Sequence, residues 1–279
     1  MALKHLLLSL DSDEDASIRY DLAIQLARAH DAHLTGLYVR NAQAAGGLPG
    51  GATAEFGEQL RQAIAAQRAG QDQAQAEAVS RFSDAASAAG VTFDQHAEDD
   101  LVGTGAVPHL VRYAHTADLV ILGKDGDGGR DIAHDVLFSS GVPVIVVPAI
   151  RQAWVGRHVM IAWNGTREAA RAVKDAMPIL ERATEVTILC VDMAEHGRNI
   201  QPGEDLAAHL RHHGIQPSVD NITRNGQSVG DAIVSRMTDA GADLLVMGAW
   251  GHSRLREFVL GGVTKSILGQ ATTPVLMSH

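Results

Sequence analysis

The sequence predicts an α/β protein made of two tandem, doubly wound parallel-sheet domains of Rossmann-like type, with about five strands in each. The first observation behind this prediction is an internal repeat. Residues 4–39 and residues 157–191 both read as an apolar strand, a polar turn, an amphipathic helix and a second apolar strand. The second observation is that the expected strands are short and apolar without alternation, as a parallel sheet covered on both faces requires.

The repeat continues along the chain and sets the expected domain boundaries. The segment 118–123 (DLVILG) matches 243–248 (DLLVMG), and 143–146 (PVIV) matches 274–277 (PVLM). We therefore expect a first domain at residues 1–149 and a second at residues 157–279, joined by a short linker. The alternation of strands and helices implies right-handed crossovers.

The elements of the first half begin with an apolar strand and a polar turn at residues 11–13. The helix after the turn is indicated by Ala16, Tyr20, Ala23 and Ala27, which recur at helical spacing. The second strand leads into a Gly- and Ala-rich loop at residues 41–54, and the Gln- and Ala-rich segment up to about residue 89 predicts one long helix or two. Apolar strands at 118–123 and 143–147 complete this half.

The second half repeats this order with a shorter insertion. Thr166 is the expected N-cap of its first helix, whose apolar stripe consists of Ala169, Val173, Ala176 and Leu180. After the strand that ends near Val191, the segment 193–213 takes the place of the long insertion. A strand at 243–248, a helical run at 265–271 and a strand at 274–278 follow.

Composition and charge restrict the classes of function. The chain has 279 residues and a formal net charge of -10, which argues against a general nucleic-acid binder because such binding needs a basic surface. No stretch approaches the roughly 18 apolar residues of a membrane span, and the acidic N-terminal region does not resemble a signal peptide. We expect a cytoplasmic protein with no membrane partner. The single cysteine, Cys190, lies in an apolar strand and is expected to be a buried thiol.

Two glycine clusters at the end of the 243–248 strand carry the main chemical prediction. Gly248 and Gly251 are followed, after nine further residues, by Gly261 and Gly262, directly before a helix. Glycines let the backbone approach a ligand, and the free N–H groups at a helix start attract anions. Thr264 adds a hydroxyl donor, and the intervening loop is predominantly basic. This pattern predicts a phosphate-binding loop that is neither a Walker loop nor the dinucleotide fingerprint; glycines that serve only tight turns are the alternative.

The spacing Met247-Gly248-x2-Gly251-x9-Gly261, with Thr264 three residues beyond, resembles the ATP-binding signature of the universal stress protein family, and the two halves resemble its tandem form. The resemblance implies a fold like that of the adenine nucleotide alpha hydrolases and a site for ATP, ADP or AMP, with or without Mg²⁺. The residues that it places at this site are Ala162, Asn164, Val191, Met247, Gly248, Trp250, Gly251, His252, Gly261, Gly262, Val263 and Thr264.

Two positions depart from the family pattern. Asn164 stands where aspartate is usual, and Gly262 stands where the family has Ser or Thr, which removes one phosphate donor. The resemblance therefore implies weaker binding, or a preference for AMP or ADP.

The first half lacks most of this chemistry. Gly123 and Gly126 are present, but Val136 stands nine residues further on, and aspartates outnumber basic residues in the loop. These aspartates would repel phosphate. We therefore expect one nucleotide per chain, bound by the second half. Asp11 matches the adenine-side aspartate of the family, and a helix N-cap is its other possible role.

Several other side chains are candidates for function. His209 could share a metal ion with His212 or His213, although a solvated helix face is the favoured explanation of these histidines. Trp163 and Trp250 could stack on adenine or pack at the rim. The sequence shows no catalytic constellation, and Asp231, at an expected helix start, is the nearest carboxylate that it offers for magnesium or water.

Two classes of function follow. The first is a stress-response or regulatory protein that binds an adenine nucleotide with slow or no hydrolysis, and the second is an interaction module that does not depend on nucleotide. A slow ATPase, or an adenylyl-transfer or redox enzyme on a similar fold, is a third reading. The last apolar strand of each half, 143–147 and 274–278, is expected to pair with the other in an intramolecular pseudo-dimer, which leaves other surfaces for a homodimer.

Overall fold

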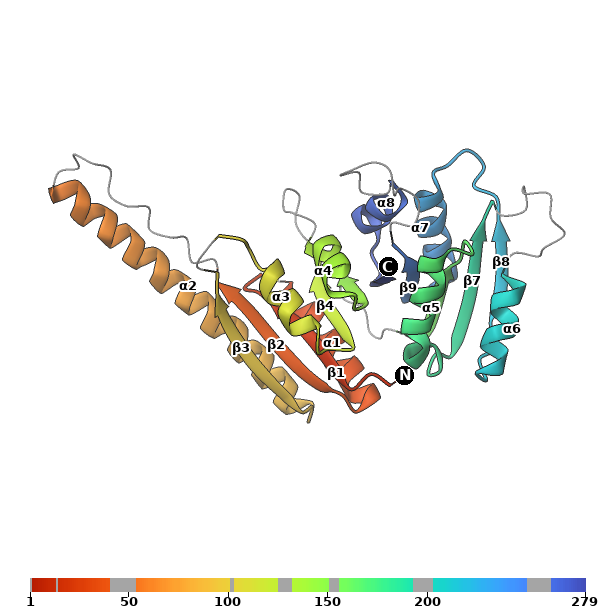
Figure 1. Ribbon diagram of the computed structural model, residues 1–279, viewed down its shortest axis with the longest axis horizontal. Coiled ribbons are helices and arrows are strands. Elements are labelled where there is room, and N and C mark those ends of the chain that lie inside the picture. The colour runs from red at the N-terminus through yellow and green to blue at the C-terminus, as the bar shows by residue number, and fades with distance from the viewer. Residues whose placement is uncertain are drawn as a thin grey trace.

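The computed structural model describes residues 2–13, 15–40, 54–100, 103–124, 132–150, 156–192, 203–249 and 262–279. The first half contains β1 (His5–Leu10), α1 (Ala16–His30), β2 (His33–Arg40), α2 (Ala54–Ala88), β3 (Phe93–Asp99), α3 (Val107–Ala114), β4 (Leu119–Gly123), α4 (Ile132–Ser140) and β5 (Val144–Val147). The second half contains β6 (His158–Ala162), α5 (Arg167–Leu180), β7 (Glu185–Val191), α6 (Glu204–His212), β8 (Ser218–Ile222), α7 (Val229–Ala240), β9 (Leu244–Gly248), α8 (Gly262–Gln270) and β10 (Val275–Ser278). Figure 1 shows this alternation of strands and helices.

The described strands form one ten-stranded sheet in the order β3-β2-β1-β4-β5-β10-β9-β6-β7-β8. Neighbouring strands are parallel within each half, so the second half repeats the strand order of the first. At the centre, β5 and β10 are antiparallel, with Ile145 opposite Leu276. The predicted pairing of the two last strands is therefore present, and a single sheet runs through both halves.

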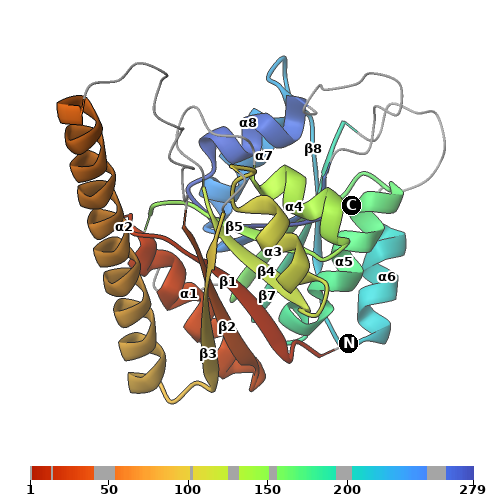
Figure 2. The same cartoon turned by 60° about the vertical axis from the view of Figure 1, so that its left-hand side comes forward.

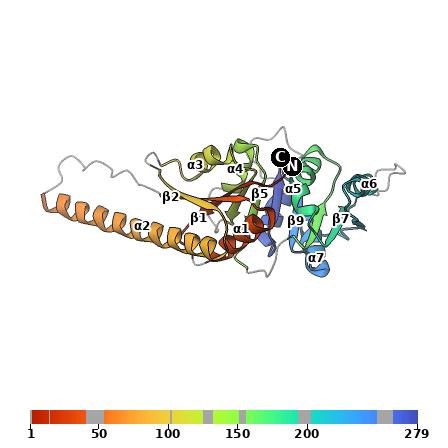
Figure 3. The same cartoon turned by 90° about the horizontal axis from the view of Figure 1, so that it is seen from below.

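Helices cover both faces of this sheet, which confirms the doubly wound α/β class. Buried side chains of α1, α2, α5 and α6 form one apolar cluster with alternate strand residues. Those of α3, α4, α7 and α8 form the second cluster on the opposite face. In Figure 3, α1 and α2 lie on one side of the first-half strands and α3 and α4 lie on the other.

The segment before β3 forms one long helix, α2, rather than two. Its C-terminal part packs on α1, where the rings of Tyr20 and Phe82 meet edge to face with their centroids 6.0 Å apart. Its N-terminal part extends beyond the sheet (Figures 1 and 2). Within the described part of the chain, no helix has the length and apolarity that a membrane crossing would need.

A pair of equivalent aspartates shows how closely the halves correspond. Asp118, just before β4, accepts hydrogen bonds from the backbone N–H groups of Lys4 (2.7 Å) and His5 (2.9 Å). Asp243, just before β9, accepts from those of Arg157 (3.1 Å) and His158 (3.2 Å). Each carboxylate thus joins the beginnings of two neighbouring strands.

Candidate functional site

The ends of β6, β7, β9 and β10 and the beginning of α8 meet at one edge of the second half, which we call the carboxyl edge. The register places Ala162 opposite Met247, and Gly248 opposite Ser278. Because parallel strands end on the same side of a sheet, Val191 at the end of β7 belongs to this edge too. Crevices at such edges are where open α/β sheets bind their ligands.

The first turn of α8 offers backbone donors at the carboxyl edge. Gly262 and Val263 are exposed, whereas Thr264 is buried with 3% of its surface exposed. The first N–H groups of a helix have no partner within it, and the helix dipole favours an anion there. Four residues of the predicted site, Trp250, Gly251, His252 and Gly261, lie outside the described residues.

Asn164 is engaged in the turn that begins α5. Its Oδ1 accepts hydrogen bonds from the hydroxyl (2.8 Å) and the backbone N–H (3.2 Å) of Thr166. The Thr166 hydroxyl in turn accepts from the N–H of Ala169 at 3.3 Å, which confirms the predicted N-cap. The side-chain carbonyl of Asn164 therefore stabilises the beginning of α5. Its amide NH₂ group is the part that could donate a hydrogen bond to a ligand.

The packing around position 248 explains why this residue is a glycine, which the sequence alone does not show. A Cβ atom at this position would collide with the backbone of Glu168 and Ala169. The first turn of α5 thus packs directly against the end of β9, which requires glycine whether or not a ligand is bound.

Two carboxylates that sequence reasoning missed lie at the carboxyl edge, and both are paired. Glu168 contacts Arg167 at 3.1 Å, and Asp192 contacts Arg224 at 2.6 Å. Burial raises the pKa of Glu168, but hydrogen bonds from its own backbone N–H and from Arg167 outweigh burial, so this pKa lies below its ordinary value. Both residues reach the edge through local turns, which a sequence pattern does not specify.

Asp231, the carboxylate that the sequence offered for chemistry, connects two helices instead. Its Oδ1 accepts hydrogen bonds from the Ser266 hydroxyl (3.0 Å) and the Gln270 amide (2.9 Å) of α8. Its own N–H donates to the Ser228 hydroxyl, the N-cap of α7. Hydrogen bonds from Gln270, Ser228 and Ser266 hold the pKa of Asp231 below its ordinary value. Its place in the first turn of α7 agrees with the helix-start role.

The first half also contributes side chains near the carboxyl edge of the second. The protonated Nδ1 of the His279 ring donates a hydrogen bond of 3.0 Å to the carbonyl of Ala249. The same ring packs on Phe138 of α4, with centroids 4.0 Å apart. The antiparallel β5–β10 pairing causes this contact, because it brings α4 to the end of β10.

In the first half, Arg19 lies against the end of β4, which corresponds to the end of β9 in the second half. Arg19 of α1 is 6% exposed, forms an ion pair with Asp11, and lies so close to Gly123 that a Cβ there would overlap its guanidinium. Asp15, without a side-chain cap bond, precedes α1, so the N-cap role considered for Asp11 is wrong. Asp11 instead binds Arg19, eight residues further along the chain.

Trp163 and the histidines of α6 are two further groups of candidate side chains. Trp163 packs against the apolar cluster beneath α5 and α6, whereas Ala162, Val191 and Met247 belong to the cluster on the opposite face. Trp163 therefore has a packing role in this cluster. Among the described residues, no group of three or more histidines, cysteines and carboxylates is arranged to hold a metal ion. The rings of His209 and His213 pack on each other, with their centroids 4.9 Å apart.

Comparison with known proteins matches the second half to a family. Residues 156–279 match the model of the universal stress protein family. A universal stress protein of Synechocystis is 26% identical over 172 residues, which is 57% of this chain and 57% of that protein. A universal stress protein of Methanocaldococcus jannaschii is 36% identical over 47 residues, 17% of this chain and 29% of that protein. The matched regions thus span little more than half of the first relative and under a third of the second.

Solved structures resemble the whole chain in fold. A universal stress protein from Archaeoglobus fulgidus superposes with a TM-score of 0.68 at 17% identity, over 98% of this chain and 95% of its own. A protein from Pseudomonas aeruginosa described as a putative universal stress protein gives a TM-score of 0.61 at 15% identity, over 99% and 93%. At identities of 17% and 15%, the similarity to these two structures shows that the chain shares their fold.

Proposed function

We propose, from the premise that residues 156–279 form a universal stress protein domain, that the carboxyl edge of the second half binds ATP or a related adenine nucleotide. The observation that carries the proposal is that Ala162 of β6 and Met247 of β9 lie opposite each other where both strands end, and that α8 begins with the exposed residues Gly262 and Val263. The amides at this helix start supply donors for phosphate, and the free NH₂ group of Asn164 supplies one for the base or ribose.

The protein then acts as a stress-response or regulatory protein through what its nucleotide-bound state contacts. Fast phosphoryl transfer needs a metal clamp and a positioned nucleophile. The described carboxylates near this edge are engaged: Glu168 by Arg167, Asp192 by Arg224, and Asp231 by α8. Steady-state turnover with Mg²⁺ and ATP should be far below the enzyme median of about 10 per second. Turnover near that value, lost in Asp231→Asn, would place the protein among the ATPases.

In this proposal the first half is a stabilising partner that binds no nucleotide. Arg19 and Asp11 fill the place at β1 and β4 that a ligand would need, and the β5–β10 pairing joins the halves as an intramolecular pseudo-dimer. Homodimers of whole chains would use other surfaces, such as α2.

Calorimetric titration with ATP, ADP and AMP tests the proposal, together with mass spectrometry of nucleotide that co-purifies with the protein. We expect one site per chain, lost in the double variant Gly251→Asp, Gly261→Asp because carboxylates would enter the phosphate loop. Gly126→Asp, at the matching place in the first half, is the control and should leave the titration unchanged. A stoichiometry near two, or binding that survives the double variant, would contradict the proposal.

A nucleotide-independent interaction module is the second candidate. Two observations favour it: Gly248 is required by the packing of α5, and the carbonyl of Asn164 is used by Thr166. This candidate predicts no heat of binding with any adenine nucleotide and no nucleotide in the purified protein. The same titration therefore separates the two candidates.

A further inference from the structure

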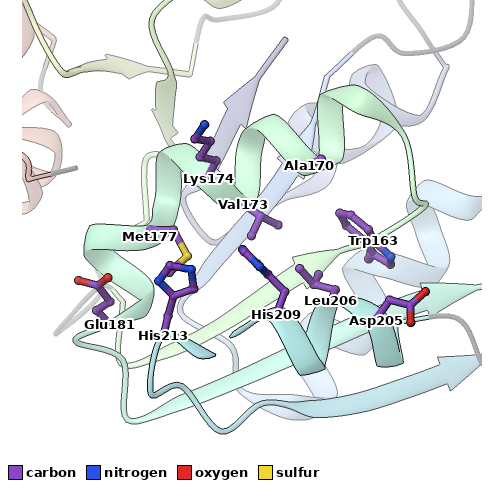
Figure 4. Close-up of a pocket in the computed structure, with 10 residues that line it drawn as sticks. All are labelled: Trp163, Ala170, Val173, Lys174, Met177, Glu181, Asp205, Leu206, His209 and His213. Carbon is purple, nitrogen blue, oxygen red and sulfur yellow. The ribbon is translucent and has the colours of Figure 1, made fainter. Parts of the chain in front are cut away.

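A groove opens between α5 and α6, on the face of the sheet that carries Trp163 (Figure 4). Its volume is about 600 Å³, within the range of roughly 300–1,000 Å³ that is typical of small-molecule sites. The residues that line it are Trp163, Ala170, Val173, Lys174, Met177, Glu181, Asp205, Leu206, His209 and His213. Trp163 lies between Ala162 and Asn164 of the carboxyl edge, whereas the other lining residues belong to α5, α6 and the residues directly after these helices.

The first half shows what occupies the corresponding space. The repeat aligns Lys4 with Arg157, which places Tyr20 of α1 at the position of Val173 of α5. The ends of α2 and α6 also correspond, because Val91 N–H donates to Ala86 O and Ile215 N–H donates to Leu210 O, each at 3.1 Å. This correspondence places Phe82 at the position of Leu206.

Two aromatic rings therefore close the gap between helices in the first half. Tyr20 is 2% exposed and Phe82 is fully buried, and their rings meet at an interplanar angle of 78°. In the second half, Val173 and Leu206 are smaller aliphatic side chains, buried in the wall of the groove. The space that the rings of Tyr20 and Phe82 fill in the first half is thus open in the second half. Val173 and Leu206, at the corresponding positions, form apolar walls around it.

The rim of the groove adds a charge preference. Asp205 lies at the end near Trp163 and Glu181 lies at the other end, while the Lys174 side chain points away from the two histidines (Figure 4). His209 and His213 complete one wall, with ring centroids 4.9 Å apart. A cation at the Trp163 end would have both a carboxylate and an aromatic ring within the same groove, and aromatic faces attract cations.

From these contacts we infer that the α5–α6 groove binds a small aromatic amine, with its ring between Val173 and Leu206 and its ammonium group toward Asp205. The ring takes the space that Tyr20 and Phe82 fill in the first half, and Met177 offers a thioether contact, which favours aromatic partners. The site would give the second half a ligand-binding function separate from the carboxyl edge.

Binding of 1-naphthylmethylamine to the full chain, followed by calorimetry and by NMR, tests this inference. 1-Naphthylacetate carries the same ring with the opposite charge, and butylamine carries the charge without the ring. We expect one amine per chain, naphthylacetate at least threefold weaker, and no measurable binding of butylamine. Equal affinity for the amine and the acid, or no binding of the amine, would overturn the inference.

Variants locate the bound amine. Val173→Tyr introduces the first-half residue into the groove and should weaken amine binding at least tenfold, while the thermal midpoint and the ATP titration stay as in the wild type. Asp205→Asn should weaken the amine about threefold, the size expected of an exposed ion pair. Asp239→Asn, which removes an exposed carboxylate of α7 on the opposite face of the sheet, is the control and should change nothing.

Leu206→Phe is the second variant if Val173→Tyr lowers the thermal midpoint, because it introduces the other first-half ring. Undiminished amine binding in a folded variant of either kind would overturn the inference. Because the proposed nucleotide site is tested by ATP in the same variants, failure of one site is distinguishable from failure of the other.

Discussion

At the scale of single residues, the two halves differ most at the ends of β4 and β9. Gly123 faces the guanidinium of Arg19, whereas Gly248 faces the backbone of α5. The equivalent glycines thus leave room for the buried Arg19 side chain in the first half and for the first turn of α5 in the second half. Position 172, which corresponds to Arg19, is the fully buried Ala172, and its small size allows α5 to approach the sheet.

The ion pair between Arg19 and Asp11 should contribute to stability in a way that a double-mutant cycle can measure. Arg19 is buried, and its Nε has no hydrogen-bond partner among the described residues, so its charge is balanced chiefly by Asp11. Arg19→Met should lower the free energy of unfolding by about 2 kcal/mol, because Asp11 loses its partner in a partly buried place.

Asp11→Asn should cost less in the Arg19→Met background than in the wild type, since the two residues act on each other. Urea unfolding of the two single variants and the double variant gives the coupling free energy. Additive costs would show that Arg19 stabilises the protein through packing alone.

At the scale of elements, the beginning of α5 connects stability to the carboxyl edge. Thr166 caps the helix, Asn164 holds Thr166, and the first turn packs on Gly248. The position of α5 therefore depends on a few hydrogen bonds within one turn.

Thr166→Ala should lower the free energy of unfolding by about 1 kcal/mol, because the N–H of Ala169 loses its side-chain acceptor. Thr166→Ser keeps the hydroxyl and should restore most of this stability. Ser228→Ala, which removes the matching cap of α7, should have a similar cost without affecting α5. Chemical denaturation measures all three, and an unchanged midpoint in Thr166→Ala would contradict the cap role.

The central elements could be predicted from sequence because buried parallel strands are continuously apolar. Apolarity and a match in the internal repeat predict the segments 118–123 and 243–248, which form β4 and β9. The outer strands β3 and β8 were not located, since each has a neighbour on one side only and carries polar residues such as Asp94, His96 and Asp220.

The candidate site was predictable where it depends on spacing and unpredictable where it depends on contacts. Glycines at 248, 261 and 262 are visible in the sequence, but the approach of Glu168 to Gly248 is set by the packing of α5 on β9. Asp11 pairs with Arg19, eight positions further along the chain and across a turn. The sequence alone does not distinguish this ion pair from an N-cap role of Asp11, because an aspartate before a helix is compatible with both.

At the scale of the whole molecule, a charged residue of the second half lowers the pKa of a histidine in α1 of the first half. His30 lies near the end of α1, and its pKa is lowered to about 4 by burial and by the positive charges of Arg182 and Lys4. Arg182 follows α5, so this effect requires both halves to be in place.

This histidine should make stability fall with acid. Its pKa is lower in the folded state than the ordinary 6.5, so the unfolded chain binds more protons between pH 6.5 and about 4. The stability that the neutral ring allows is present above pH 6.5 and is lost as the pH falls toward 4, by about 1–2 kcal/mol after allowance for partial exposure.

Urea unfolding between pH 7 and pH 4.5 measures this effect. His30→Gln should flatten the pH dependence, whereas His212→Gln, at an exposed position of α6, should leave it unchanged. Equal slopes in wild type and His30→Gln would show that other groups cause the loss.

The place of β10 in the sheet also affects how the protein is made. β5 is composed of four buried apolar residues, and one of its two neighbours is β10, the last strand in chain order. During translation, residues 148–274 are synthesised between these two strands, which takes on the order of ten seconds at roughly 5–20 residues per second. For that time the nascent first half presents an apolar strand edge, so chaperone binding on the ribosome should be concentrated in this interval.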